Sequence, residues 1–150
     1  MAWYEGAFFY QIFPDRYFRA GPFGKPAPAG PLEPWEAPPS LRGFKGGTLW
    51  GIAEKIPYLK DLGVEALYLN PVFASTANHR YHTTDYFQVD PLLGGNMALR
   101  HLLEVAHAHG MRVILDGVFN HTGRGFFAFQ HLLENGEQSP YRDWYYVKGF

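Results

Sequence analysis

The sequence predicts an α/β fold with a parallel sheet, and three observations support this prediction. Segments with strand and helix patterns alternate in the order strand, helix, strand, helix, strand, as in sheets built with right-handed crossovers. The last strand is a continuous apolar run, which is typical of strands covered on both faces. Returns from helix to strand are short, whereas long polar, aromatic-rich segments follow the strands. Functional residues are therefore expected at the carboxyl ends of the strands, as in a β/α barrel or a doubly wound sheet.

The bulk composition predicts one folded, soluble domain. The chain has 150 residues, 47% of them apolar and 18% charged, which suffices for a core. A net charge of −1 argues against nucleic-acid or anionic-membrane partners, because both require a basic surface. The absence of cysteine excludes disulfides and thiolate metal sites. No signal peptide or membrane-spanning run is evident, so we expect a cytoplasmic protein.

The first predicted strand is the aromatic run AFFYQIFP at residues 7–14, which Pro14 ends. Residues 20–40 follow, with seven prolines and several glycines. This composition is typical of a linker. An ordered surface loop fits equally well, because the segment lies between a strand and a helix.

The first predicted helix covers residues 48–63. Its apolar residues recur at helical spacing: Leu49, Ile52, Ala53, Ile56, Leu59 and Leu62. Thr48 is placed to cap the amino end and Gly63 to stop the carboxyl end. Pro57 lies inside the pattern, so we expect a kink or break after Lys55.

Two strands and one helix complete the predicted pattern. Residues 64–73 form the second strand, which ends at an Asn-Pro turn signal. The second helix is predicted over residues 96–110, with Asn96 as its cap and Gly110 as its end. Residues 112–119 form the third strand.

Polar side chains mark the end of the third strand. Asp116 ends the apolar run, and Asn120 and His121 follow. A carboxylate there is unfavourable unless it is paired, and backbone donors or a neighbouring arginine would satisfy it. Taken alone, Asn120 is more often a turn residue, and a lone histidine such as His121 is more often a neutral hydrogen-bonded group than a ligand. Their combination at one strand end favours a functional site.

The stretch ANHRYHTTDYF after the second strand suits a polyhydroxylated ligand such as a sugar. Tyr81 and Tyr86 provide rings, and Asp85 provides an acceptor. A loop that packs its own rings is the alternative. His79 and His82 are three residues apart, which suits a metal only on a helix, and no acidic or cysteine ligand joins them. We therefore predict no metal site here.

Candidate catalytic groups are few. Serine or cysteine nucleophiles find little support, because the chain has no G-x-S-x-G motif and no cysteine. Glycoside hydrolysis requires two carboxyl groups that flank one bond. Asp15, Asp85 and Asp116 are the acidic residues near strand ends, and sequence spacing alone pairs none of them.

Five ordered segments resemble the α-amylase family of glycoside hydrolases, and within it the neopullulanase, cyclomaltodextrinase and maltogenic amylase group. The segments are FFYQIFPDRYF, GGTLWGIAEKIPYLKDLGVEALYLNPVF, NHRYHTTDYFQVDP, RVILDGVFNH and FFAFQHLLENGEQSPYRDWYYV. The D-x-V-x-N-H motif that begins at Asp116 is short but specific in this context. The resemblance implies the N-terminal portion of a TIM (β/α)8 barrel. It also implies cleavage of α-1,4 and α-1,6 glucan bonds with retention of configuration.

The resemblance implies roles for single residues. His121 would hydrogen-bond the sugar next to the cleaved bond, Tyr81 would stack on that sugar, and His79 would be a polar contact nearby. Asp116 would hold a catalytic-site arginine. Two further residues would be structural at the site: Asn120 and Asp85.

Calcium is the one cofactor that the resemblance admits, and the chain departs from the calcium-binding pattern. Relatives have aspartate after the glycine pair, where this chain has Thr48 after Gly46-Gly47. They also have Asn and Asp in the preceding loop, where this chain is rich in proline. We therefore predict no metal ligand. Relatives further have aspartate after the stacking tyrosine, where this chain has His82.

The family's nucleophile, general acid and third carboxylate follow later strands, and a β/α barrel takes about 250 residues. We expect residues 1–122 to hold the first three strands and two helices of the barrel. Residues 123–150 are expected to begin the extended loop domain after the third strand, with the rest of the barrel missing. No domain is expected before Trp3. The chain alone should be inactive.

The whole protein is expected to act on α-glucans. Its oligomeric state is open, with a homodimer as one alternative. Three other interpretations remain open. One is a non-catalytic carbohydrate-binding or scaffold relative, and another is a different sugar-active β/α barrel. The third is a self-standing three-layer α/β domain of this length.

Overall fold

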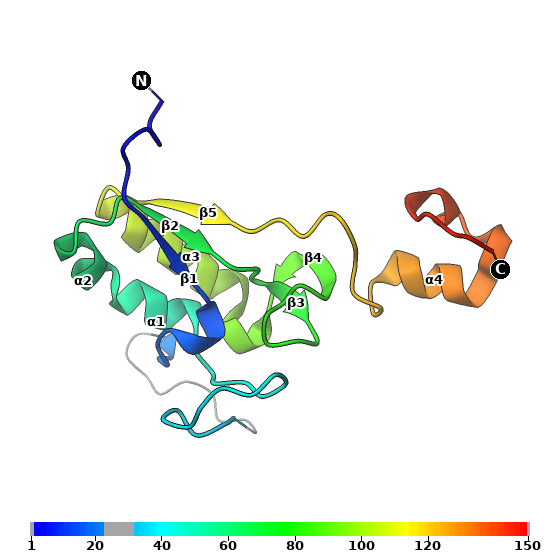
Figure 1. The fold of residues 1–150 in the computed structure, drawn as a ribbon, viewed down its shortest axis with the longest axis horizontal. Coiled ribbons are helices and arrows are strands. Elements are labelled where there is room, and N and C mark those ends of the chain that lie inside the picture. Colours follow the sequence, from blue (N-terminus) through cyan, green and yellow to red (C-terminus); the bar gives the residue numbers. More distant parts are fainter. Residues whose placement is uncertain (1, 23–31, 150) are drawn as a thin grey trace.

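The computed structural model describes residues 2–22 and 32–149. Its centre is a parallel sheet (Figure 1). The strands are β1 (Phe9–Ile12), β2 (Ala66–Leu69) and β5 (Arg112–Leu115), in the spatial order β1-β2-β5. Leu67 lies opposite Tyr10 on one side and Val113 on the other. The predicted parallel topology is confirmed, although each strand is shorter than its apolar run.

The core lies between this sheet and three helices. These are α1 (Leu49–Glu54), α2 (Ile56–Asp61) and α3 (Gly95–Ala108). Both layers contribute fully buried side chains, among them Ile12, Leu67 and Leu69 from strands and Ile52, Ile56, Leu59 and Leu102 from helices. Each such side chain stabilises the fold by roughly 1.5–3 kcal/mol relative to an exposed one.

The predicted features of the first helix are confirmed. The Thr48 hydroxyl accepts a hydrogen bond from Gly51 N, 3.0 Å away. The helix breaks at Lys55, between α1 and α2, because Pro57 has no N–H to continue the ladder. Gly63 follows α2 with a φ of +91°, a conformation that glycine adopts without strain.

The amino end of α3 differs from the prediction. The helix begins at Gly95, and Gly94 precedes it with a φ of 103°. Asn96 does not cap it, so that prediction is wrong. Its side-chain oxygen instead accepts from Val89 N at 2.8 Å and ties the helix start to the preceding strand. The two glycines allow the chain to turn into the helix one residue earlier.

An antiparallel hairpin that the sequence pattern did not predict follows β2. It consists of β3 (Phe73–Ser75) and β4 (Thr83–Val89), with shifts in register. Its connection contains Arg80, which is fully buried and has a φ of +59°. The β4 stretch mixes buried, half-buried and exposed residues without strict alternation, which explains why period-two patterning missed it.

Strand β5 is less covered than its apolar run predicted. Arg112 is exposed, and the other residues of the strand are half-buried. The strand pairs with β2 on one side only in the described residues. To be fully covered, β5 would need a neighbouring strand on its other side and packing against both faces of the sheet.

The proline-rich segment is an ordered loop over its described part. Glu33 N donates to Phe44 O at 2.8 Å, and Gly47 N donates to Asp15 O at 2.8 Å. Of the two alternatives, the ordered loop is therefore correct from residue 32 onward. Residues 23–31 lie outside the described residues.

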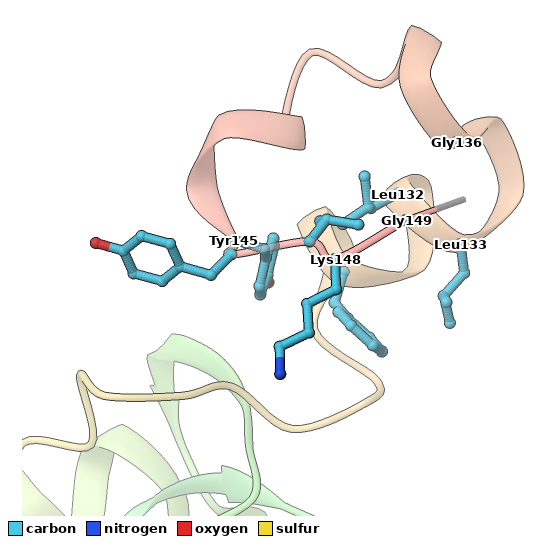
Figure 2. Close-up of a pocket in the computed structure, with 9 residues that line it drawn as sticks. Leu132, Leu133, Gly136, Tyr145, Lys148 and Gly149 are labelled. Carbon is cyan, nitrogen blue, oxygen red and sulfur yellow. The ribbon is translucent and has the colours of Figure 1, made fainter.

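After β5 the chain runs to helix α4 (Phe127–Asn135), which lies apart from the sheet in Figure 1. An apolar pocket of about 630 Å³ lies between this helix and residues 145–149 (Figure 2). Short 3₁₀ helices lie at Pro14–Arg16, Pro91–Leu93, Gly136–Gln138 and Arg142–Trp144. Over residues 2–22 and 32–149, no helix has the length and apolar character needed to cross a bilayer.

Candidate functional site

The candidate site lies at the carboxyl ends of β2 and β5. Asn70 follows β2 and donates its N–H to Ile12 O at the end of β1. Asp116 follows β5, and its N–H donates to Leu69 O at 3.1 Å. The parallel register therefore places an amide and a carboxylate side by side at one edge of the sheet. This is the edge where β/α folds carry their functional groups.

Tyr81, from the connection between β3 and β4, joins these two side chains. Its hydroxyl donates to Asp116 Oδ2 at 2.6 Å and accepts from Asn70 Nδ2 at 3.3 Å. The Asp116 carboxylate is the main cause that raises the pKa of Tyr81 above its usual value, and partial burial adds to it. Burial, followed by Asp116, likewise raises the pKa of Tyr68. The Tyr81 phenol is thus held as the donor to the Asp116 carboxylate.

His121 lies against the backbone of the same tyrosine. Its Nε2 is 2.9 Å from Tyr81 O, and because a carbonyl only accepts, Nε2 carries the proton. Nδ1 is then the acceptor for Asn120 Nδ2 at 3.4 Å. The Tyr86 hydroxyl donates to Val118 O at 2.6 Å and lies 3.1 Å from His121 O. The turn that carries the histidine is thereby fixed from both sides.

His79 is held on the other side of Tyr81. Its Nδ1 accepts from Tyr81 N at 3.1 Å, which leaves the proton on Nε2. Burial is the first cause that lowers the pKa of His79, and the nearby His82, Arg16 and Arg80 add to it. A neutral imidazole that keeps a donor nitrogen is suited to hydrogen-bond a sugar hydroxyl.

His79 and His82 lie side by side, without a third metal ligand among the described residues. The His79 and His82 rings meet edge to face with centroids 5.0 Å apart. Across the described ranges, no three His, Cys, Asp or Glu side chains come together as a metal would require.

Two of the acidic candidates lie outside this cluster. The Asp85 carboxylate accepts from Phe87 N in its own strand at 2.8 Å. Within the described chain it takes no part in the hydrogen bonds that join Tyr81, Asp116 and His121. Asp15 is 1% exposed and accepts from Lys45 N and Gly46 N at 2.8 and 3.1 Å. It anchors a loop and is closed to substrate.

Sequence reasoning missed Asn70 as a member of the site and treated Tyr86 only as a ring. Asn70 had a usable signal, because it directly follows a strand that is parallel to the one ending at Asp116.

Beside His121, a pocket of about 260 Å³ is lined by aromatic and polar side chains, among them Phe119, Asn120, Trp144 and Tyr145. Rings and hydrogen-bonding groups of this kind suit the apolar faces and hydroxyls of sugars.

A parallel sheet with helices on it and polar groups at its carboxyl edge is the arrangement of β/α-barrel and doubly wound folds. Residues 11–149 match the model of the alpha amylase catalytic domain, and the chain belongs to this family. The resemblance seen in the sequence motifs is thus confirmed, as is the fold class.

Individual relatives agree with this assignment. The chain is 44% identical over 150 residues to neopullulanase 2 from Thermoactinomyces vulgaris, covering 99% of the chain and 25% of that protein. It is 43% identical over 145 residues to a cyclomaltodextrinase from Thermoanaerobacter pseudethanolicus, covering 97% of the chain and 25% of that protein. The chain therefore spans about a quarter of the length of these relatives.

Solved structures share the fold. Ttha1563 from Thermus thermophilus superposes with a TM-score of 0.91 at 90% identity, over 99% of this chain and 31% of that one. The cyclic α-maltosyl-(1→6)-maltose hydrolase from Arthrobacter globiformis, in complex with its cyclic substrate, gives a TM-score of 0.88 at 40% identity. That match covers 96% of this chain and 32% of the hydrolase.

Proposed function

We propose that the whole protein is a glycoside hydrolase that cleaves α-1,4 bonds, and α-1,6 bonds to some degree, in maltodextrin, pullulan or cyclodextrin. The carrying observation is the Tyr81–Asp116–His121 cluster at the carboxyl edge of the sheet, in a chain of the alpha amylase family. The names of the relatives, neopullulanase and cyclomaltodextrinase, support this substrate class.

In this proposal the cluster binds and orients substrate. Tyr81 presents a ring whose position is fixed at its hydroxyl by Asp116 and Asn70, so the ring can stack on a sugar without losing rotational freedom. His79 lies beside the ring and keeps an Nε2–H donor for a sugar hydroxyl. His121, which lies against the Tyr81 carbonyl, would exchange that contact for a sugar hydroxyl when substrate binds. A carboxylate has about four lone-pair positions, so Asp116 can also accept from an arginine supplied by a later strand.

The bond-breaking carboxylates belong to the rest of the protein in this proposal. A retaining mechanism needs two carboxyl groups about 5–5.5 Å apart, one as nucleophile and one as general acid. Asp15 and Asp85 are committed to backbone donors. Residues 1–122 then form the first part of the barrel and residues 123–150 the start of the loop domain. Asn120 serves to position His121, and Asp85 to shape its strand.

A cytoplasmic location and a homodimer are further parts of the proposal. The chain is 41% identical over 149 residues to the intracellular maltogenic amylase of Bacillus subtilis, whose name supports the location. Light scattering on the purified whole protein measures the oligomeric state directly.

The test uses the whole protein and two variants of one residue. Wild-type protein should release oligosaccharides from pullulan, cyclodextrin or maltodextrin, measured by chromatography of the products. Tyr81→Ala removes the ring, so kcat/KM should fall by roughly a hundredfold. Tyr81→Phe keeps the ring and loses only the hydroxyl, so the fall should be clearly smaller. Absence of turnover on all three glucans by the whole protein would overturn the proposal.

A further inference from the structure

The loop before α1 is built around a buried ammonium group. The Lys45 side chain is 5% exposed. Its Nζ donates to Pro34 O at 2.6 Å and to Ala37 O, and it lies 3.6 Å from Glu33 Oε2. The cation is therefore surrounded by two carbonyl oxygens and a carboxylate, all from the loop itself.

The backbone of this lysine is fixed as firmly as its side chain. Lys45 N donates to Asp15 Oδ2 at 2.8 Å, and Lys45 O accepts from the Arg19 guanidinium. Asn78 Nδ2 donates to Gly43 O at 2.7 Å, which holds the neighbouring turn. The ammonium is thus positioned by contacts at both ends of the side chain.

In the family that the sequence resembles, calcium would bind in this same loop. The residues of the loop in this chain do not fit that ion. Calcium takes six to eight oxygen ligands at about 2.3–2.6 Å. Between residues 16 and 47 the sequence has no Asp, Asn or Gln, and its acidic residues are Glu33 and Glu36. Glu33 already faces the Lys45 ammonium, and a divalent ion among the same oxygens would meet direct charge repulsion.

We propose that the Lys45 ammonium is the built-in cation of this loop and occupies the role that a bound metal ion would have. The loop carbonyls and Glu33 converge on a positive charge that is covalently part of the chain. The loop is therefore ordered without any metal. This inference concerns the loop alone and does not depend on the proposed substrate.

Limited trypsin digestion of the whole protein tests this locally. Arg42 is exposed and lies in the loop, so cleavage after Arg42, followed by mass spectrometry, reports opening of the loop. We expect Lys45→Ala to speed this cleavage roughly tenfold, because the converging oxygens lose their partner. Ethylammonium in the buffer should slow it again by filling the vacated position. Lys60→Ala, at an exposed lysine, should show neither effect.

Chelation distinguishes a loop held by the Lys45 ammonium from a loop held by bound calcium. EDTA should leave cleavage after Arg42 unchanged in the wild-type protein. Faster cleavage with EDTA, reversed by calcium, would overturn the inference. So would a Lys45→Met variant that is cleaved after Arg42 at the wild-type rate, because Met retains most of the length of the side chain and lacks the charge.

Discussion

Tyr81 shows how one residue can serve both the fold and the site. Its hydroxyl links residues that follow two different strands, Asn70 and Asp116, and its backbone contacts both histidines of the cluster. The ring is half-buried, so part of it remains accessible. A rigid ring loses little entropy when a sugar packs on it.

Replacing Asp116 by Asn keeps the shape of the side chain and removes its charge, so the variant tests the effect of the carboxylate on Tyr81. The amide oxygen can still accept from Tyr81, but the hydrogen bond to a charged carboxylate, which is the main cause of the raised pKa of Tyr81, is lost together with the negative charge. We expect the pKa of Tyr81 to move down toward its usual value, measured by ultraviolet difference titration against a Tyr81→Phe background. Asp61→Asn, at an exposed helix end, is the control. An unchanged Tyr81 titration in Asp116→Asn would contradict the assignment of the raised Tyr81 pKa to the Asp116 carboxylate.

Tyr17 predicts a pH dependence of stability. Burial, followed by Tyr10 and Tyr58, raises its pKa from 10.0 to about 12. The unfolded chain therefore releases this proton before the folded chain does. The stability linked to Tyr17 is complete below pH 10.0 and is lost as the pH rises toward about 12. Urea unfolding should show a smaller loss over this range for Tyr17→Phe than for wild type. Parallel curves would show that Tyr17 is not responsible.

At the scale of elements, the sequence predicted those that depend on local chemistry. Thr48 and Pro57 fix the start and the break of the first helical region through a hydroxyl and a missing N–H, and both act within a few residues. The position of Asp116 at a strand end also follows from the apolar run before it. These features required no knowledge of distant contacts.

The hairpin of β3 and β4 could not be predicted in the same way. Its pairing has register shifts, and its connection depends on the buried Arg80, whose partner Asp90 lies at the far end of β4. Asn70 was missed for a similar reason, since its role depends on Tyr81 in that connection. Tertiary contacts, rather than residue patterns, determine this part of the site.

The ion pair of Arg80 and Asp90 should stabilise the hairpin that carries Tyr81. Arg80 Nε donates to Asp90 Oδ2 at 2.8 Å, and both side chains are almost fully buried. Arg80→Met leaves Asp90 as an uncompensated buried charge, so the free energy of unfolding should fall by about 3–5 kcal/mol. Urea titration of the whole protein measures the change.

A double variant distinguishes lost charge pairing from lost packing. Asp90→Asn keeps the oxygen that accepts from Leu92 N and removes the unpaired charge. Arg80→Met with Asp90→Asn should therefore be more stable than Arg80→Met alone. If the two variants unfold at the same urea concentration, packing of Arg80 against Phe44 would be the more important contribution.

At the scale of the whole molecule, the described structure exposes surfaces that a complete barrel would cover. Phe119 is 84% exposed and lies shortly after the strand that Asp116 follows. Strand β5 pairs on one side only in the described residues, and an open parallel edge with apolar neighbours favours association. A next barrel strand would pair with this open edge.

The last prediction concerns residues 1–150 expressed alone. The chain should release no sugar from pullulan, because Asp15 and Asp85 accept from backbone N–H groups and Asp116 accepts from Tyr81, whereas the mechanism needs two carboxyl groups that act on one bond. It should also bind an apolar dye and associate with rising concentration, measured by fluorescence and light scattering, whereas the whole protein should do neither. Turnover by the isolated chain would contradict the assignment of catalysis to later strands. A monomer that unfolds cooperatively and binds no dye would instead support a self-standing α/β domain. Such behaviour requires that the strand edge and the aromatic rings be covered within the chain itself.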